Sequence, residues 1–316
     1  MRMQLLRSYV AAGVVLLTAF ITEPADAWVA QRSGGAYVGV GDLITFNVYY
    51  GLRAYSNAVA AAGTQPLARI RNTTTNELCD VLVAMTGGIG LTSNCSGAGA
   101  GQTVSDFCGA VDCAVHTLYD QLNANACVTS TTCNVVQTTN ANQPALSASD
   151  SYRVLITTGN TSMKLVSANN YSNGSTNPMT LTAVGQKNGQ FLASFVSSQG
   201  NQGAINGITG SPTTWQLIGT GNNTTISLAD NAWHSIVGVI NGAGASGLCA
   251  STSCAAYAGT ATIPNTAGKP TITTITNVAA VEKWREAGWA TNHAATAGEA
   301  SAINSNTSAY WGFTPP

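Results

Sequence analysis

The chain has 316 residues, of which 45% are hydrophobic and only 8% are charged, and its formal net charge is −1. The charged fraction lies far below the quarter that is typical of globular proteins. A net charge so close to zero argues against nucleic acid or anionic lipid as a partner, because neither would be attracted electrostatically.

Residues 1–27 have the features of a secretory signal. Arg2 and Arg7 precede an apolar run from Tyr9 to Ile21, and Ala25-Asp26-Ala27 supplies a small-x-small cleavage pattern. A membrane anchor is the alternative, but a run of about 13 residues is too short for a hydrocarbon core of roughly 30 Å. We therefore expect residues 28–316 to form one domain that is secreted, held at the cell surface or periplasmic, without membrane insertion.

Eight cysteines in an exported chain indicate disulfide bonds. Their spacing favours pairing in sequence order, because three pairs close gaps of only four or five residues. Zinc is the alternative, but the sequence has no C-x-x-C motif, and its three histidines are far apart. The expected pairs are Cys79/Cys95, Cys108/Cys113, Cys127/Cys133 and Cys249/Cys254.

The N-terminal half of the domain predicts a short helix followed by two strands. Good helix formers run from Leu52 to Ala62, where Gly63 ends them. Leu67–Arg71 alternates apolar and basic residues, as a half-exposed strand does. A second strand is expected over Leu78–Met85.

Beyond Pro144 the sequence predicts a series of short strands separated by Gly, Asn and Ser turns, as in a sandwich. The predicted strands are Tyr152–Thr157, Met179–Gln186, Phe191–Ser197, Thr214–Ile218, Thr224–Leu228 and His234–Ile240. Ala232–Gly242 resembles a strand of laminin-G and concanavalin-type sandwiches. The chain ends with Trp284–Trp289 and a short helix near Thr296–Ile303. This C-terminal segment is similar to that of many bacterial members of the class. The predicted fold is all-β, a concanavalin A-like jelly-roll β-sandwich with short peripheral helices and local disulfides.

The segment from Phe107 to Gln121 gives the most specific resemblance. It reads Phe107-Cys108, then Cys113, then Tyr119-Asp120-Gln121, and resembles the F-C-x4-C-x5-Y-D-Q segment of the α-L-arabinofuranosidase B family. The resemblance extends more loosely over residues 48–123. It implies a secreted protein with a lectin-like sandwich, and in the family a retaining glycoside hydrolase that acts on terminal arabinofuranosyl groups.

Such a hydrolase needs two carboxyl groups that face one glycosidic bond. The family nucleophile is a glutamate in a middle strand, near two adjacent cysteines. This chain has no adjacent cysteines and no glutamate between Glu77 and Glu282. Asp120 and Asp230 are the catalytic candidates from their positions near strand ends. The competing interpretation is that Asp120 caps a turn or pairs with an arginine such as Arg53, and that Asp230 lies in a turn.

The remaining acidic and polar residues suggest binding rather than catalysis. We expect Glu282, Lys283, Arg285 and Glu286 to form a solvated face with surface charge pairs. Trp215, Tyr171 and Asn222 are candidate sugar-binding residues, since an aromatic ring stacks on a sugar and an amide bonds its hydroxyls. The competing interpretation is that most of the aromatics belong to the core, because Trp and Tyr are more often buried than not. No metal site is predicted; calcium is left open because no dense Asp/Asn motif is present.

Three functions follow from these observations. The first is carbohydrate or polysaccharide recognition outside the cell, without catalysis and without a cofactor. The second is an α-L-arabinofuranosidase, a retaining glycoside hydrolase. The third is a structural or adhesive surface protein that keeps only the sandwich. The absence of glutamate between Glu77 and Glu282 favours carbohydrate recognition over hydrolysis.

Overall fold

The computed structural model describes the part of the chain that forms the domain core. The described residues are 36–84, 87–88, 93–122, 127, 133–147, 155–157, 164–169, 178–186, 192–193, 204–207, 213–219, 223–229, 231–241, 246–250, 253–256, 269–273 and 282–313. The predicted signal at residues 1–27 lies outside them. Within the described ranges, no helix is long and apolar enough to cross a membrane.

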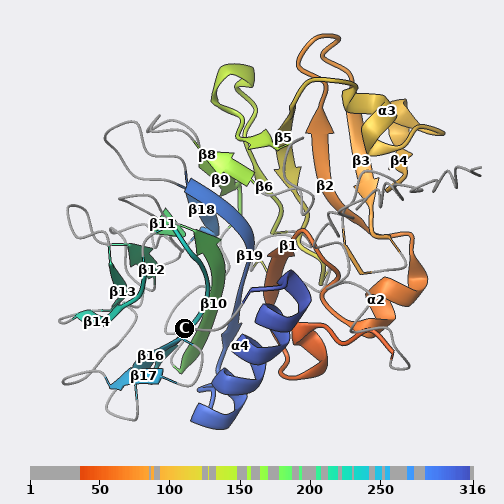
Figure 1. The fold of residues 1–316 in the computed structure, drawn as a ribbon. Helices are drawn as coiled ribbons and strands as arrows, with labels where there is room; N and C mark the ends of the chain where they lie inside the picture. The colour runs from red at the N-terminus through yellow and green to blue at the C-terminus, as the bar shows by residue number, and fades with distance from the viewer. Residues whose placement is uncertain are drawn as a thin grey trace, which may run out of the picture.

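Antiparallel strands dominate the structure (Figure 1). Those of the N-terminal half are β1 Val48–Gly51, β2 Pro66–Arg71, β3 Leu78–Leu82, β4 Cys95–Ser96, β5 Cys113–Leu118, β6 Val135–Val136, β7 Ala145–Leu146, β8 Leu155–Thr157 and β9 Lys164–Ser167. Those of the C-terminal half are β10 Met179–Gln186, β11 Leu192–Ala193, β12 Ala204–Gly207, β13 Thr214–Ile218, β14 Asn223–Ser227, β15 Trp233–Ile240, β16 Gly247–Ala250, β17 Ser253–Ala256, β18 Thr271–Thr273 and β19 Glu282–Thr291. The α-helices are α2 Asn57–Ala62, α3 Val104–Cys108 and α4 Ala297–Trp311.

The strands form two sheets. The larger has the order β17-β16-β15-β10-β19-β8-β7-β5-β2-β3-β4, with β1 paired to β19 and with β6, β9 and β18 off this path. The smaller has the order β11-β12-β13-β14. The chain therefore folds as the all-β sandwich that its sequence predicts, with peripheral helices.

The long strand β19 is central, and its position decides where the charged residues on it lie. It pairs with β10 along one edge and with β1 and then β8 along the other. Successive side chains of β19 point to opposite faces of the sheet. Those on one face pack between the two sheets, and those on the other face point toward α4. Figure 1 shows α4 lying against this part of the large sheet.

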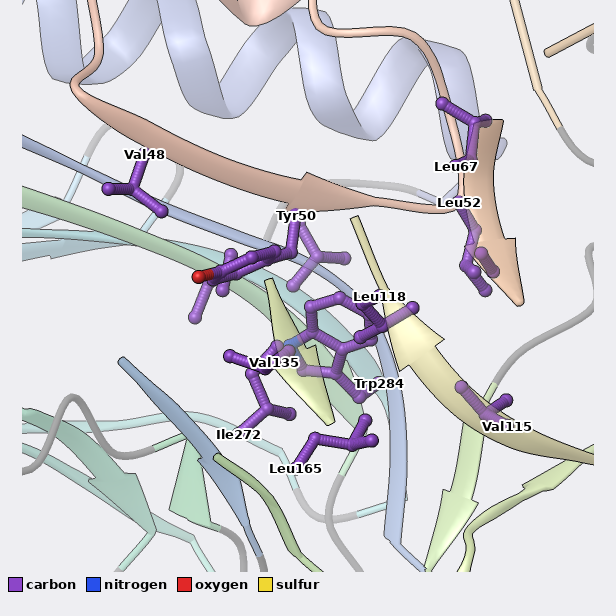
Figure 2. Close-up of a cluster of buried hydrophobic side chains, with 14 of the residues drawn as sticks. Val48, Tyr50, Leu52, Leu67, Val115, Leu118, Val135, Leu165, Ile272 and Trp284 are labelled. Atoms are coloured by element: carbon purple, nitrogen blue, oxygen red, sulfur yellow. The ribbon is translucent and has the colours of Figure 1, made fainter. Parts of the chain in front are cut away.

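The main core lies between the strands of both halves of the chain. Figure 2 shows side chains of this core, among them Tyr50 of β1 and, close to one another, Leu118 of β5 and Trp284 of β19. A second cluster lies on the helix side of the sheet, where Tyr49 and Val237 pack toward Ile303 of α4. Strands β1 and β15 are thus buried on both faces.

All four disulfides have the predicted pairing: Cys79–Cys95, Cys108–Cys113, Cys127–Cys133 and Cys249–Cys254. Each is local in sequence, with separations of 5 to 16 residues. They staple β3 to β4, α3 to β5 and β16 to β17, so they fix turns rather than join the sheets.

Two helices differ in extent from the prediction. The predicted helix over Leu52–Ala62 begins only at Asn57, because Leu52 and Arg53 continue the extended chain beside β19 and Gly88. Ser56 caps α2 and Gly63, at φ 63°, ends it as predicted. The C-terminal helix was predicted to end near Ile303 but continues to Trp311.

The contact between the two sheets can be tested at Gly238 of β15. A Cβ atom placed there would lie 2.6 Å from Cδ1 of Leu217 in β13. We expect Gly238→Val to lower the free energy of unfolding by about 1–3 kcal/mol, because it overpacks this contact. Urea unfolding of the variant measures the loss.

The control is the double variant Gly238→Val with Leu217→Ala. If the two side chains compete for one space, the double variant loses less stability than the sum of the single variants. Strict additivity would contradict the described packing of β13 on β15.

Candidate functional site

A buried ion pair connects β19 with the segment that follows β1. Nε of Arg53 lies 2.7 Å from Oε2 of Glu286, and its Nη2 lies 3.1 Å from Oε1. Both side chains are at most 1% exposed. The Tyr49 hydroxyl also donates to Oε2, and Nε1 of Trp311 donates to Oε1 over 3.2 Å. Glu286 therefore receives four hydrogen bonds, two on each oxygen.

The rest of the Arg53 guanidinium holds the C-terminal helix. Nη1 donates to Oδ1 of Asn306 over 2.9 Å, and Nη2 donates to Oγ1 of Thr307 over 3.0 Å. The guanidinium also lies 4.8 Å from the ring centroid of Tyr310. Since all these partners belong to α4, one arginine joins the sheet and the helix.

The Glu286 carboxylate affects the titration of both Arg53 and Tyr49. Burial by itself lowers the pKa of Arg53, but the Glu286 carboxylate more than offsets this and holds that pKa above its ordinary value. Burial, reinforced by the Glu286 charge, raises the pKa of Tyr49 well above its ordinary value. Tyr49 thus remains a hydrogen-bond donor to Glu286 at any physiological pH.

A β-bulge explains why two successive charged residues point to the same side. Between Val184 and Gly185 of β10, the opposite residue on β19 changes from Glu286 to Trp284, so Arg285 has no opposite residue. Bulges of this kind redirect a side chain. Trp284 consequently stays in the core between the sheets, while Arg285 joins Glu286 on the side of α4.

Arg285 is enclosed by aromatic rings. Its guanidinium lies 3.6 Å from the ring centroid of Trp233 and 4.7 Å from that of Trp311. A cation over the face of an indole ring is stabilised by the ring quadrupole, most strongly where water is excluded. Arg285 is 2% exposed, so this stabilisation is close to its maximum.

The predicted solvated face is therefore wrong for two of its four residues. Arg285 and Glu286 are buried, because β19 is a central strand covered on both faces. Lys283 is half-buried near the strand end, and the Glu282 side chain lies outside the described part of the structure. Sequence reasoning missed the pairing of Glu286 with Arg53, which lies 233 residues away.

Asp120 is a buried carboxylate of the Tyr-Asp-Gln segment. Its Oδ1 accepts hydrogen bonds from the backbone N–H of Leu122, over 3.2 Å, and of Tyr49, over 3.3 Å. Its Oδ2 is buried with no hydrogen-bond partner among the described residues. Burial, opposed in part by those two N–H groups, raises the pKa of Asp120 to about 6. Asp120 thus caps a turn, whereas Arg53 pairs with Glu286.

Gln121 completes the role of this segment. Its side-chain oxygen accepts from the backbone N–H of Tyr55 over 2.6 Å. Its side-chain nitrogen donates to the carbonyls of Gly51, over 3.1 Å, and Arg53, over 2.8 Å. The segment that carries the resemblance therefore clamps the backbone that presents Arg53 to Glu286.

Other described carboxylates stabilise local backbone. Asp42 accepts from the backbone N–H of Gly39 and Asn57, each over 2.8 Å. Asp106 and Glu299 complete the capping boxes of α3 and α4. The described residues contain no group of three or more His, Cys, Asp or Glu side chains that could hold a metal ion.

Of the three predicted ligand-binding residues, the structure describes only Trp215. Trp215 is fully buried in β13, so its ring has no face open to a sugar, and this corrects its assignment as a binding residue. Trp289 of β19 and Tyr310 of α4 are also buried. The candidates Tyr171, Asn222 and Asp230 lie outside the described residues.

Comparison with known proteins gives a likeness in structure alone. No family model and no curated protein matches the chain. A GH54 α-L-arabinofuranosidase soaked with a cyclic sulfate inhibitor superposes with a TM-score of 0.57 and 12% identity, over 86% of this chain and 65% of that one. An arabinofuranosidase complexed with arabinofuranosyl-α-1,2-xylobiose gives a TM-score of 0.55 and 10% identity over the same shares. The likeness shows the arabinofuranosidase B-like sandwich fold, and this chain spans 65% of the length of those enzymes.

Removal of the charge of Glu286 tests the buried ion pair. We expect Glu286→Gln to lower the free energy of unfolding by about 3–5 kcal/mol, because Arg53 is left as an uncompensated buried charge. The matched control is Glu299→Gln, a partly exposed cap, which costs about 1 kcal/mol or less. Equal losses in the two variants, measured by urea unfolding, would contradict the role of the pair.

The raised pKa of Asp120 predicts a defined pH dependence of stability. Between its unfolded pKa near 3.8 and its folded pKa of about 6, the folded state holds a proton that the unfolded state has lost. This contribution to stability is thus fully present below about pH 4 and is lost as the pH rises through 6.

Asp120→Asn removes the titration and serves as the reference. From pH 4 to pH 7, we expect the unfolding free energy of the natural chain to fall relative to this variant by on the order of 2–3 kcal/mol. Urea titrations of both proteins at pH 4, 5, 6 and 7 measure the difference. A difference that is flat or that rises with pH would contradict a raised pKa.

Proposed function

We propose that this protein recognises carbohydrate outside the cell and does not hydrolyse it with the carboxylates described above. The observation that carries the proposal is the state of Glu286, the buried glutamate of the central strand β19. Its two oxygens accept four hydrogen bonds and it is 1% exposed, so it has no free lone-pair direction for a substrate. A glycosidase needs two carboxyl groups that can reach the same bond.

The fold supports carbohydrate as the ligand class. The sandwich superposes on two arabinofuranosidase structures, one of them complexed with an arabinofuranosyl-xylobiose. One fold hosts lectins and hydrolases alike, so the likeness supports the ligand class more strongly than the reaction. Four disulfides among the described residues suit an oxidising compartment, in line with export.

The second candidate function is that of an α-L-arabinofuranosidase. The observation in its favour is the extent of the likeness, which covers 86% of the chain. In that case Asp120, whose raised pKa of about 6 suits a general acid, and Asp230 are the carboxylates to test. The burial of Asp120 beneath backbone groups argues against direct contact with a substrate.

Two measurements on the purified, oxidised protein separate the candidates. We expect no release of 4-nitrophenol from 4-nitrophenyl α-L-arabinofuranoside, together with retardation in gels that contain a neutral plant polysaccharide such as arabinoxylan or arabinan. Turnover that Asp120→Asn or Asp230→Asn abolishes would instead establish the hydrolase. Neither turnover nor retardation would favour a structural or adhesive protein.

A further inference from the structure

A hollow of about 430 Å³ lies between the end of α2 and the end of β3. Its size falls in the range of pockets that hold small ligands. Small residues of α2 and the segment after it line one side, and Leu82, Val83 and Asn94 are among the residues on the other. The lining residues are Ala61, Ala62, Gly63, Leu82, Val83, Ala84, Ser93 and Asn94.

A polar group lies beside this hollow on the same face of the sheet. In β3 the buried residues alternate with half-buried ones, so Asp80 and Leu82 both point outward. Two residues along a strand are about 7 Å apart. Asp80 is not one of the residues that line the hollow, but it lies one such step along the strand from Leu82, which does.

Asp80 is held rigidly by two neighbours. Arg69 of β2 donates two hydrogen bonds to it, from Nε over 2.7 Å and from Nη2 over 2.8 Å. The Tyr119 hydroxyl donates to Oδ1 of Asp80 over 2.5 Å. Arg69 also lies 5.9 Å from the ring centroid of Tyr119, which is half-buried. Such a bidentate pair beside an aromatic ring is preorganised to bond hydroxyl groups.

The charges in this group balance. Arg69 and Asp80 neutralise one another, and two hydrogen bonds help to hold the pKa of Asp80 below its ordinary value despite burial. Burial, together with Arg69 and Arg71, lowers the pKa of the nearby His116, which is therefore neutral at pH 7. Arg71 is turned to other partners, the side chains of Gln143 and Asn76. This balance favours a neutral ligand over an acidic one.

We infer that the hollow and the Arg69–Asp80–Tyr119 group together bind a neutral glycosyl unit, an inference that rests on the proposed function. The hollow takes the sugar ring against Leu82 and the alanines of α2. The Arg69–Asp80 pair beside the hollow bonds the hydroxyl groups. The ring of Tyr119, the residue that follows β5, lies beside this pair and is in part open to solvent.

A second hollow in the structure provides the control. It has a volume of about 250 Å³ and lies between the β16–β17 hairpin and the start of α4. Its described lining is mainly apolar, with Val239, Ala255 and Ala300 among its residues, and none of these described residues is charged. The terminal residue of a helix is an exposed alanine in each hollow, Ala62 at the end of α2 in the first and Ala297 at the start of α4 in the second.

The experiment places a tryptophan in each hollow in turn. Binding of the natural chain, Ala62→Trp and Ala297→Trp is measured by affinity gel electrophoresis in arabinoxylan, arabinan, galactan and mixed-linkage β-glucan, with polygalacturonate as the acidic comparison. For the neutral polysaccharide that retards the natural chain, we expect Ala62→Trp to weaken binding about tenfold or more. Ala297→Trp should leave it within about twofold.

Two further variants distinguish a loss of binding from a loss of the folded structure. Tyr119→Phe keeps the ring but frees Asp80 of one donor, and Asn94→Trp obstructs the first hollow from its opposite wall. Both should weaken binding while the unfolding midpoint stays close to that of the natural chain. Retardation should also be insensitive to salt, because no net charge is involved.

The outcomes are distinct. If Ala62→Trp and Asn94→Trp bind as the natural chain does, this site is wrong while the proposed function stands. If the natural chain binds only polygalacturonate, in a salt-sensitive way, the neutral ligand is wrong. If it binds no polysaccharide, the proposed function fails and this inference fails with it.

Discussion

The ion pair between Arg53 and Glu286 is the interaction on which the rest of the structure depends. Removal of two charges from water costs several kcal/mol per ion, and their attraction repays this only where every remaining donor and acceptor is satisfied. Glu286 therefore needs Tyr49 and Trp311, and Arg53 needs the polar side chains of α4. These requirements fix the chain after β1, the bulge in β19 and the position of the helix together.

The Tyr-Asp-Gln segment, Tyr119–Gln121, holds the backbone that carries this ion pair. Gln121 bonds backbone groups on both sides of Arg53, and Asp120 bonds the backbone of Tyr49, the residue that donates to Glu286. The strongest sequence resemblance in the chain therefore reports a structural clamp. Since the clamp positions a saturated carboxylate, the resemblance in this segment is explained by the fold and does not by itself imply a catalytic site.

Strand bounds and disulfide pairs that depend on neighbouring residues were predictable from local sequence patterns. Met179–Gln186 and Thr214–Ile218 were predicted with their observed bounds, because Gly and Asn turns flank runs of β-forming residues, and the short cysteine spacings gave the disulfides. The burial of Glu286 was not predictable in this way, because Glu-Lys-Trp-Arg-Glu reads locally as solvent-exposed. The extent of α4 was also missed, since its Asn and Thr residues are poor helix formers whose side chains are satisfied only by tertiary partners such as Ser235.

Glu286 and Asp80 differ in whether a ligand can reach the carboxylate. A carboxylate that is buried and saturated, as Glu286 is, stabilises the fold but is closed to a substrate. Asp80 is different, because it is held by Arg69 and Tyr119 beside a hollow and remains partly exposed to solvent. Rigid and solvent-accessible polar groups bind a sugar with little entropic cost, yet one carboxylate tied to an arginine lacks the partner that hydrolysis requires. The same arrangement that suits recognition thus opposes catalysis at that place.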